Sequence, residues 1–200
     1  MNTIHLRAIE PEDLDFLYRI ENDVKLWNVG ITNVPYSRYA LHDYVANASG
    51  DIYTDHQVRL IVENAEHQVV GIADIVDFDA SNRRAEIGLV IEQPFRGQGY
   101  GFSAMKELER YALDVLHLHQ LYAIIDVRNE TCLQLFRQMG YHESSRLKEW
   151  LYDGREYRDA IVMQTFFLKK ARKSFVVSEI IPTFAPANEK KATWCVSSVG

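Results

Sequence analysis

Hydrophobic residues alternate with polar ones in several short stretches of this chain, a pattern typical of β-strands. Residues 4–9 (IHLRAI) alternate in this way, and three longer apolar runs follow at 58–63, 69–78 and 83–91, separated by short polar turns. Three successive strands without a helix between them predict an antiparallel meander.

Other stretches have the three- and four-residue spacing of helices. Residues 14–21 follow an acidic turn that contains a proline, and Ser37 can cap a second helix with an apolar stripe. Residues 102–116 and 130–139 are also expected to be helices, and Gly140 is a natural C-terminal cap for the second of them.

The remaining elements complete an α/β (α+β) fold with a mixed sheet and flanking helices. Residues 120–127 (QLYAIIDV) predict a buried strand, and Asp153-Gly154 predicts a hairpin between two later strands. From Lys169 onward the periodicity is lost. We therefore expect a single domain over residues 1–168, followed by an irregular tail over residues 169–200 that rests on a neighbouring subunit.

Composition narrows the class of protein. The 200 residues are 47 % apolar, enough for one cored domain, and 22 basic against 28 acidic residues give a net charge of -6. This balance argues against nucleic acid and favours cationic partners. The two cysteines lack metal or redox spacing, and neither a leader nor a run of ~20 apolar residues is present. We expect a reduced, cytoplasmic protein without a membrane partner.

Three glycines stand between an apolar strand and a helix in residues 86–101 (EIGLVIEQPFRGQGYG). Free N–H groups at a helix N-terminus bind anions, and glycine lets a phosphate approach the backbone. Alternatively, the glycines only make a tight turn. There is no Gly-Lys-Ser/Thr loop, and the G-x-G-x-G spacing with a single βαβ unit argues against a dinucleotide-binding fold, although Asp126 sits where a ribose-binding acid would.

Residues 96–101 (RGQGYG) resemble the R/Q-x-x-G-x-G/A pyrophosphate loop of the GNAT superfamily of acetyl-CoA-dependent N-acetyltransferases. The order of elements from Ile4 to Phe167 is similar to the whole GNAT domain, and VRNETCLQLFRQMGY resembles a later motif of it. Within the superfamily the chain looks like bacterial spermidine/spermine N-acetyltransferases and ribosomal-protein N-terminal acetyltransferases.

The resemblance implies a sheet with splayed central strands and a site for acetyl-CoA as co-substrate. The loop would donate N–H groups to the pyrophosphate, the strand at 89–91 would pair with pantetheine, and the helix from Asn129 would lie along the other side. The implied cofactor-binding residues are Leu89, Val90, Ile91, Arg96, Gly97, Gln98, Gly99, Tyr100, Gly101, Phe102, Asn129 and Phe136.

Acetyl transfer requires a neutral amine and a polarised thioester. A primary alkylamine has a pKa of ~10.4, so its proton must be removed, and Glu86 is the candidate base and amine contact. Alternatively, Glu86 is a solvated acid paired with Arg83 or Arg84. The N–H of Val90 is the candidate group that polarises the carbonyl. Asp77 matches an acidic position of the polyamine enzymes and is a second candidate contact for an ammonium group.

Phe136 stands where the superfamily usually has a tyrosine that protonates the departing thiolate. A thiol has a pKa of ~8.5, so its thiolate can leave without obligatory protonation. Water or Tyr141 could substitute for the missing phenol. Phe136 can also be explained as a core residue, since it shares a helical face with Cys132 and Leu133.

We therefore expect an enzyme that acetylates a primary amine, such as a polyamine or another small cationic amine. The alternatives are a protein N-terminus, an amino sugar, or a non-catalytic acyl-CoA-binding module. Residues 29–36 lack the acids that polyamine enzymes carry there, so their regulatory site is not expected. His117 and His119 lack companion ligands, and no metal is expected. We also expect a homo-oligomer, a dimer or larger.

Overall fold

The computed structural model of this chain describes residues 2–23, 35–47 and 50–167. The chain divides into two units, Met1–Leu168 and Lys169–Gly200, and each is considered by itself. The second unit lies outside the described residues, as does most of the segment at 29–36. The expected tail therefore stays a prediction.

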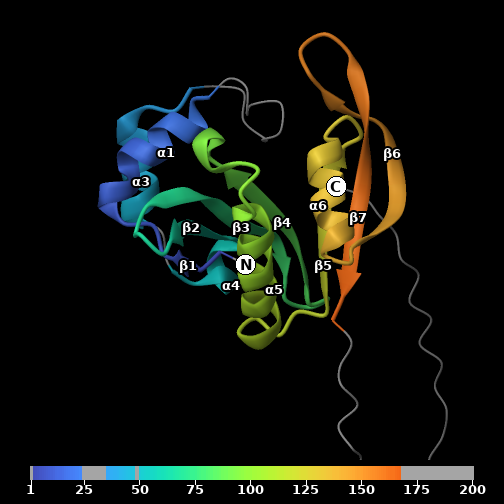
Figure 1. The fold of residues 1–200 in the computed structure, drawn as a ribbon, viewed down its shortest axis with the longest axis horizontal. Coiled ribbons are helices and arrows are strands. Elements are labelled where there is room, and N and C mark those ends of the chain that lie inside the picture. Colours follow the sequence, from blue (N-terminus) through green and yellow to red (C-terminus); the bar gives the residue numbers. More distant parts are fainter. Residues whose placement is uncertain (1, 24–34, 48–49, 168–200) are drawn as a thin grey trace, which may run out of the picture. The chain divides into compact units, whose positions relative to one another are not determined.

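Seven described strands form one mixed sheet in the order β1-β2-β3-β4-β5-β7-β6 (Figure 1). All neighbouring strands are antiparallel except the central pair β4 and β5, which is parallel. The expected meander β2-β3-β4 and the expected β6–β7 hairpin are confirmed. The strands are β1 (Ile4–Arg7), β2 (Val58–Asn64), β3 (Val69–Asp79), β4 (Arg84–Ile91), β5 (Gln120–Asp126), β6 (His142–Tyr152) and β7 (Tyr157–Phe166).

The expected helices are also present, and their ends have the expected caps. The hydroxyl of Ser37 accepts a 3.0 Å hydrogen bond from the N–H of Ala40, and Gly140 has a φ of 88°. One short helix, α4 (Ile52–Asp55), was not predicted. The others are η1 (Pro11–Asp13), α1 (Leu14–Glu21), α3 (Arg38–Asn47), η2 (Gln93–Phe95), α5 (Tyr100–Asp114) and α6 (Glu130–Gln138).

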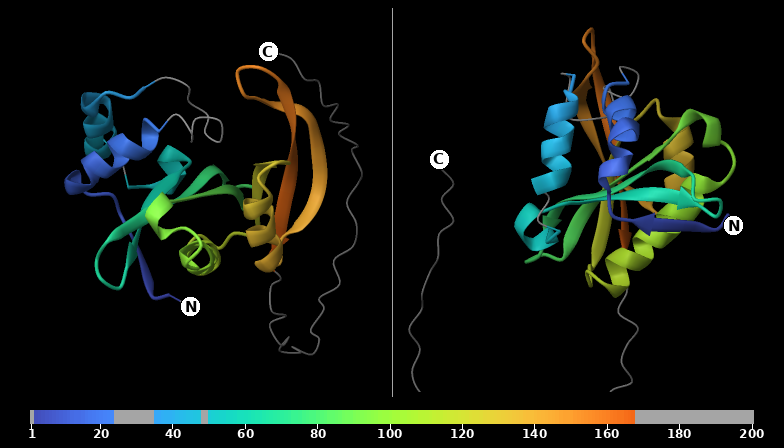
Figure 2. Two further views of the ribbon diagram at one scale, coloured as in Figure 1. Left: turned by 45° about the horizontal axis from the view of Figure 1, so that its top comes forward. Right: turned by 90° about the vertical axis from the view of Figure 1, so that its left-hand side faces the viewer.

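Helices cover both faces of the sheet, and each face has its own core (Figure 2). On one face α5 and α6 pack on buried residues of the strands, including Ala85, Ile87 and Leu121. On the other face α1 and α3 pack on Ile61 and Ile72. Because side chains alternate along a strand, Glu86 belongs to the face of α1 and α3.

The central strands β4 and β5 separate after three residue pairs (Figure 1). The last of these pairs joins Glu86 to Tyr122, and the remainder of β4, residues 87–91, has no partner on that side among the described strands. We call the opening beyond Glu86 and Tyr122 the splay. It confirms the splayed centre that the resemblance implied.

Candidate active site

The glycine loop, residues 96–101, connects β4 to α5 and presents free backbone donors. Within the described part of the chain, no hydrogen-bond acceptor meets the N–H groups of residues 97 to 102. The N–H of Arg96 is different, because it donates to the carbonyl of Gln93 at 3.3 Å. Six free donors at the start of a helix have the arrangement that suits an anion, whereas Arg96 contributes no free amide.

Two of the glycines are required by the backbone conformation itself. Gly97 and Gly99 have φ angles of 72° and 86°, which L-residues rarely adopt. A Cβ atom added at either position would meet no atom within 4 Å, so the space beside the loop is open. The loop is thus a glycine-dependent turn whose free amides also suit a phosphate group.

The predicted contacts on β4 lie at the splay. Leu89, Val90 and Ile91 pair with β3 on one side only. The backbone groups of Leu89 and Ile91 face away from β3 and can satisfy the amides of an extended ligand, as a missing strand would, whereas those of Val90 face β3. The side chain of Arg96 donates to the carbonyl of Ile91 at 2.7 Å, which ties the loop to the end of this strand.

The predicted contacts on α6 have structural partners of their own. The side chain of Asn129 caps the helix by accepting from the N–H of Cys132 at 3.2 Å. Phe136 is 3 % exposed and lies edge-on to the ring of Tyr141, with centroids 4.8 Å apart. The interpretation of Phe136 as a core residue is confirmed, and this burial does not support it as a cofactor contact.

Tyr141 is enclosed in the same core and is only 2 % exposed. Burial raises the pKa of Tyr141, and the nearby carboxylate of Glu109 raises it further. A proton donor for the reaction must reach the departing sulfur at the splay. This enclosed and weakly acidic phenol therefore does not support the expected role of Tyr141 as a substitute acid.

Glu86 lies half-buried at the base of the splay. Burial raises the pKa of Glu86, a hydrogen bond from the Ile124 backbone opposes this, and the negative charge of Asp77 adds to it. No described cation forms an ion pair with Glu86, and Arg84 pairs instead with Asp79 at 3.3 Å. The alternative of a solvated acid paired with an arginine is therefore wrong within the described chain.

The three aspartates of β3 do not form one cluster. Asp77 sits in a register shift of the β3–β4 pair with a φ of 49°, and this shift breaks the simple alternation expected from the sequence. Asp79 bonds to Asn82 and Arg84, and Asp74 bonds to Arg59. Only Asp77 stays exposed, in the neighbourhood of Glu86.

Tyr122 was missed by sequence reasoning, which treated residues 120–127 only as a buried strand. Its register opposite Glu86 and its alternation with Leu121 and Ala123 place it on the Glu86 face. The polar tip of a tyrosine in an otherwise apolar strand was the signal available in the sequence.

A second charged cluster, the Arg59 cluster, lies farther along the same face. Arg59 donates to both carboxylate oxygens of Asp74, at 2.9 and 3.0 Å, and also pairs with Glu21. Burial alone would lower the pKa of Arg59, but the two acids raise it above its usual value. Each acid of the cluster is therefore paired with a cation of the chain.

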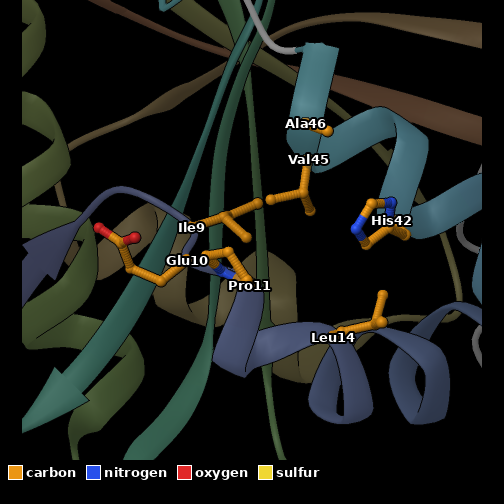
Figure 3. A pocket seen from close by; sticks show the side chains of 7 residues that line it. All are labelled: Ile9, Glu10, Pro11, Leu14, His42, Val45 and Ala46. Atoms are coloured by element: carbon orange, nitrogen blue, oxygen red, sulfur yellow. The ribbon is translucent and has the colours of Figure 1, made fainter.

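A pocket between the start of α1 and helix α3 lies apart from these groups (Figure 3). Its lining is Ile9, Glu10, Pro11, Leu14, His42, Val45 and Ala46. In Figure 3 the carboxylate of Glu10 points away from the other lining side chains. No residue predicted for the site lines this pocket.

The described residues contain neither a metal-binding cluster nor a membrane-spanning helix. Within residues 2–23, 35–47 and 50–167, no group of three or more His, Cys, Asp or Glu residues could hold a metal ion. No helix in that part of the chain is long and apolar enough to cross a membrane. The expectation that no metal is required stays a prediction.

Comparison with known proteins identifies the class. Residues 3–142 match the acetyltransferase (GNAT) domain family, and the chain belongs to that family. It is 26 % identical over 170 residues to a spermidine N(1)-acetyltransferase of Escherichia coli, covering 82 % of this chain and 87 % of the relative.

Solved structures agree on the fold. A Vibrio cholerae spermidine N-acetyltransferase, solved in complex with CoA and spermine, has a TM-score of 0.73 at 24 % identity, covering 82 % of this chain and 95 % of that one. A dodecameric structure of a V. cholerae spermidine N-acetyltransferase has a TM-score of 0.68 at 25 % identity, with coverages of 82 % and 93 %. The expected GNAT fold and acetyl-CoA-dependent acetyltransferase class are confirmed.

Proposed function

We propose that this enzyme transfers acetyl from acetyl-CoA to a primary amine of a polyamine or of another small cationic amine. The observation that carries the proposal is Glu86, half-buried at the base of the splay, near Asp77 and without a paired cation among the described residues. Such a carboxylate favours a cationic ligand. The spermidine acetyltransferases among the relatives, and the V. cholerae complex with spermine, support this substrate class.

Each step of the transfer has a candidate group. Glu86 accepts the proton of the ammonium group, directly or through water, and its raised pKa makes it a stronger base than an exposed carboxylate. The thioester carbonyl can be polarised by the N–H of Leu89 or Ile91, which face the splay. The N–H of Val90 instead faces β3, as does that of Glu92, which donates to the carbonyl of Val70, so the expected role of Val90 is not supported. Asp77 holds a second positive charge of the amine.

The glycine loop is proposed as the pyrophosphate site of CoA. Gly99→Val should weaken CoA binding strongly, because a branched residue cannot hold a φ of 86° and would fill the open space beside the amides. Arg96→Ala should weaken binding less, because Arg96 is exposed and its N–H is already bonded. Calorimetric titration of CoA into both variants, with folding checked by circular dichroism, measures the difference.

If folded Gly99→Val binds CoA like the parent, the glycines serve only the turn. The Arg96→Ala variant is the comparison within the same loop, because it removes the side-chain bond to Ile91 but keeps both glycines with positive φ.

An oligomer is also proposed. Aromatic side chains on the β6–β7 hairpin are exposed, with Trp150 at 57 % and Tyr157 at 64 %, and β6 is a sheet edge. Exposed apolar side chains on an edge strand suit a second copy. The dodecameric structure of a V. cholerae spermidine N-acetyltransferase supports an oligomer of this chain. The use of acetyl-CoA supports the expected cytoplasmic location. Light scattering of the purified full chain measures the assembly.

The acceptor is tested by incubating the protein with acetyl-CoA and following free thiol. The panel contains spermidine, spermine, a monoamine, an amino sugar and a peptide with a free N-terminus. Release above blank that is greatest with the polyamines is expected. Greatest release with the peptide would establish the N-terminal alternative, and no release with any amine, with CoA bound, would establish a non-catalytic module.

A further inference from the structure

The proposed transfer leaves the sulfur of CoA as a thiolate, for which water and Tyr141 are the expected proton donors. Phe136 has no hydroxyl, and the hydroxyl of Tyr141 is buried away from solvent beside Glu109. A further hydroxyl at the splay would therefore be a useful proton donor.

Tyr122 is at the splay. It belongs to the third and last residue pair between β4 and β5, directly opposite Glu86, where the strands separate. Its strand neighbours Leu121 and Ala123 are buried on the α5 face, so the phenol lies on the other face with Glu86. Tyr122 itself is half-buried, and no hydrogen bond of the described residues engages its hydroxyl.

The charges around Tyr122 decide how it can act. Burial raises the pKa of Tyr122, and the negative charges of Glu86, Asp77 and Asp79 raise it further against the opposing effect of Arg84. The phenol therefore stays protonated at working pH, and a phenolate beside two carboxylates is unfavourable. Such a phenol can give up its proton only while it receives another.

We propose that Tyr122 is a catalytic residue that relays a proton from Glu86 to the sulfur of CoA. The inference rests on the proposed acetyl transfer to an amine. The amine nitrogen forms a bond to the acetyl carbon, the C–S bond breaks, and its electron pair stays on sulfur. The ammonium group first passes one proton through Glu86 to solvent, which leaves a neutral amine. As this amine becomes an amide, Glu86 takes the second proton lost by nitrogen, while Tyr122 gives its own proton to sulfur and receives that of Glu86. Both side chains return to their initial states.

The first test compares two tyrosine variants with the most active amine of the panel. Tyr122→Phe should lower kcat by ~10²-fold, the usual contribution of general acid–base catalysis, and leave both KM values unchanged. Tyr111→Phe is the matched control, because Tyr111 is also half-buried with a pKa raised by burial, but it lies on α5. An unchanged kcat in Tyr122→Phe overturns the proposal.

The second test separates a catalytic from a structural role by changing the leaving group. An acetyl thioester of a CoA analogue whose thiol is more acidic than that of CoA releases a thiolate that depends less on protonation. The loss of kcat in Tyr122→Phe should therefore be at least ~10-fold smaller with this analogue than with acetyl-CoA. An equal loss with both thioesters overturns the proposal, since it would mean that Tyr122 acts only through the fold.

The third test does not require an acceptor amine. The pH titration of ¹³Cζ-labelled tyrosines by NMR gives the pKa of Tyr122, with its signal assigned by its loss in Tyr122→Phe. Glu86→Gln should lower this pKa, because a negative charge beside the phenol is removed. An unchanged pKa overturns the relay even if every amine is acetylated. Conversely, a lowered pKa without turnover of any amine rejects the proposed function alone.

Discussion

Two clusters of acids lie on the same face of the β2-β3-β4 meander, and they differ in whether a cation of the chain balances them. In the Arg59 cluster, one guanidinium bonds both Asp74 and Glu21. At the splay, Glu86 and Asp77 form no described ion pair. Both acids of the first cluster have a cationic partner within the fold, whereas those of the second are left to bind a cation from outside it.

The difference has a cost in stability. A half-buried carboxylate without a paired cation loses hydration, and the hydrogen bond from the Ile124 backbone offsets only part of this cost, so the pKa of Glu86 is raised. Strain of this kind is common at functional sites. The comparison therefore predicts opposite responses. Removing an acid at the splay should lower activity without lowering stability, whereas removing an acid from the Arg59 cluster should lower stability without lowering activity.

The largest effect is expected for Glu86→Gln. Loss of the base should lower kcat by ~10²- to 10⁴-fold while CoA binding is retained. Steady-state kinetics with acetyl-CoA and the most active amine measure the loss, and calorimetry measures CoA binding. A kcat close to that of the parent would mean that water accepts the amine proton and that Glu86 is not the catalytic base.

The same variant should be more stable than the parent at neutral pH. The folded pKa of Glu86 is raised, so its contribution to stability is complete below the unfolded pKa and is lost as pH rises through the folded pKa. Glutamine does not titrate. Urea unfolding should show a higher free energy of unfolding for Glu86→Gln than for the parent at pH 7, and this difference should shrink near pH 4. A lower free energy of unfolding at pH 7 would contradict the assignment of a charge without a paired cation.

The Arg59 cluster should respond in the opposite sense. Asp74→Asn removes a carboxylate that accepts two hydrogen bonds from Arg59 and leaves this partly buried cation with Glu21 alone. The expected loss is about 1–3 kcal/mol in the free energy of unfolding. Urea unfolding measures it, with Asp114→Asn on the exposed end of α5 as the control. If both variants are equally stable, the cluster contributes no net stability.

The sequence predicted most of the fold because its local signals agree with the tertiary structure. The meander, the glycine turn and the Asp153-Gly154 hairpin each have their own periodicity or turn residues. The four-residue helix α4 was missed, since it is shorter than the repeat on which helical periodicity depends.

The site was predicted less completely, because it depends on pairing between distant segments. The position at which β4 and β5 part places Tyr122 opposite Glu86, and no local pattern encodes that register. The positive φ of Asp77 likewise follows from an irregularity in the β3–β4 pairing. The burial of Tyr141 could not be predicted from the sequence either, because it depends on the packing of α5 and α6.

The smallest effect is expected for Asp77→Asn. Asparagine tolerates the left-handed conformation that Asp77 adopts, so the irregularity in β3 should persist while one negative charge is lost. Asp77 is exposed, and an exposed charge contributes about 0.2–1 kcal/mol, so the KM for spermidine should rise by about 1.4- to fivefold with little change in kcat.

A monoamine should show a smaller rise in KM, because only Glu86 is proposed to meet its single ammonium group. The difference between the two amines should also shrink as salt is added, since salt screens exposed charges. Steady-state kinetics at low and high ionic strength, with Asp114→Asn as a charge-matched control on another element, test both expectations. Equal KM values for spermidine in the parent and in Asp77→Asn would show that Asp77 does not bind the polyamine. Glu86 would then be the one acid of the splay that contacts the substrate, and the second ammonium group would have no partner on β3.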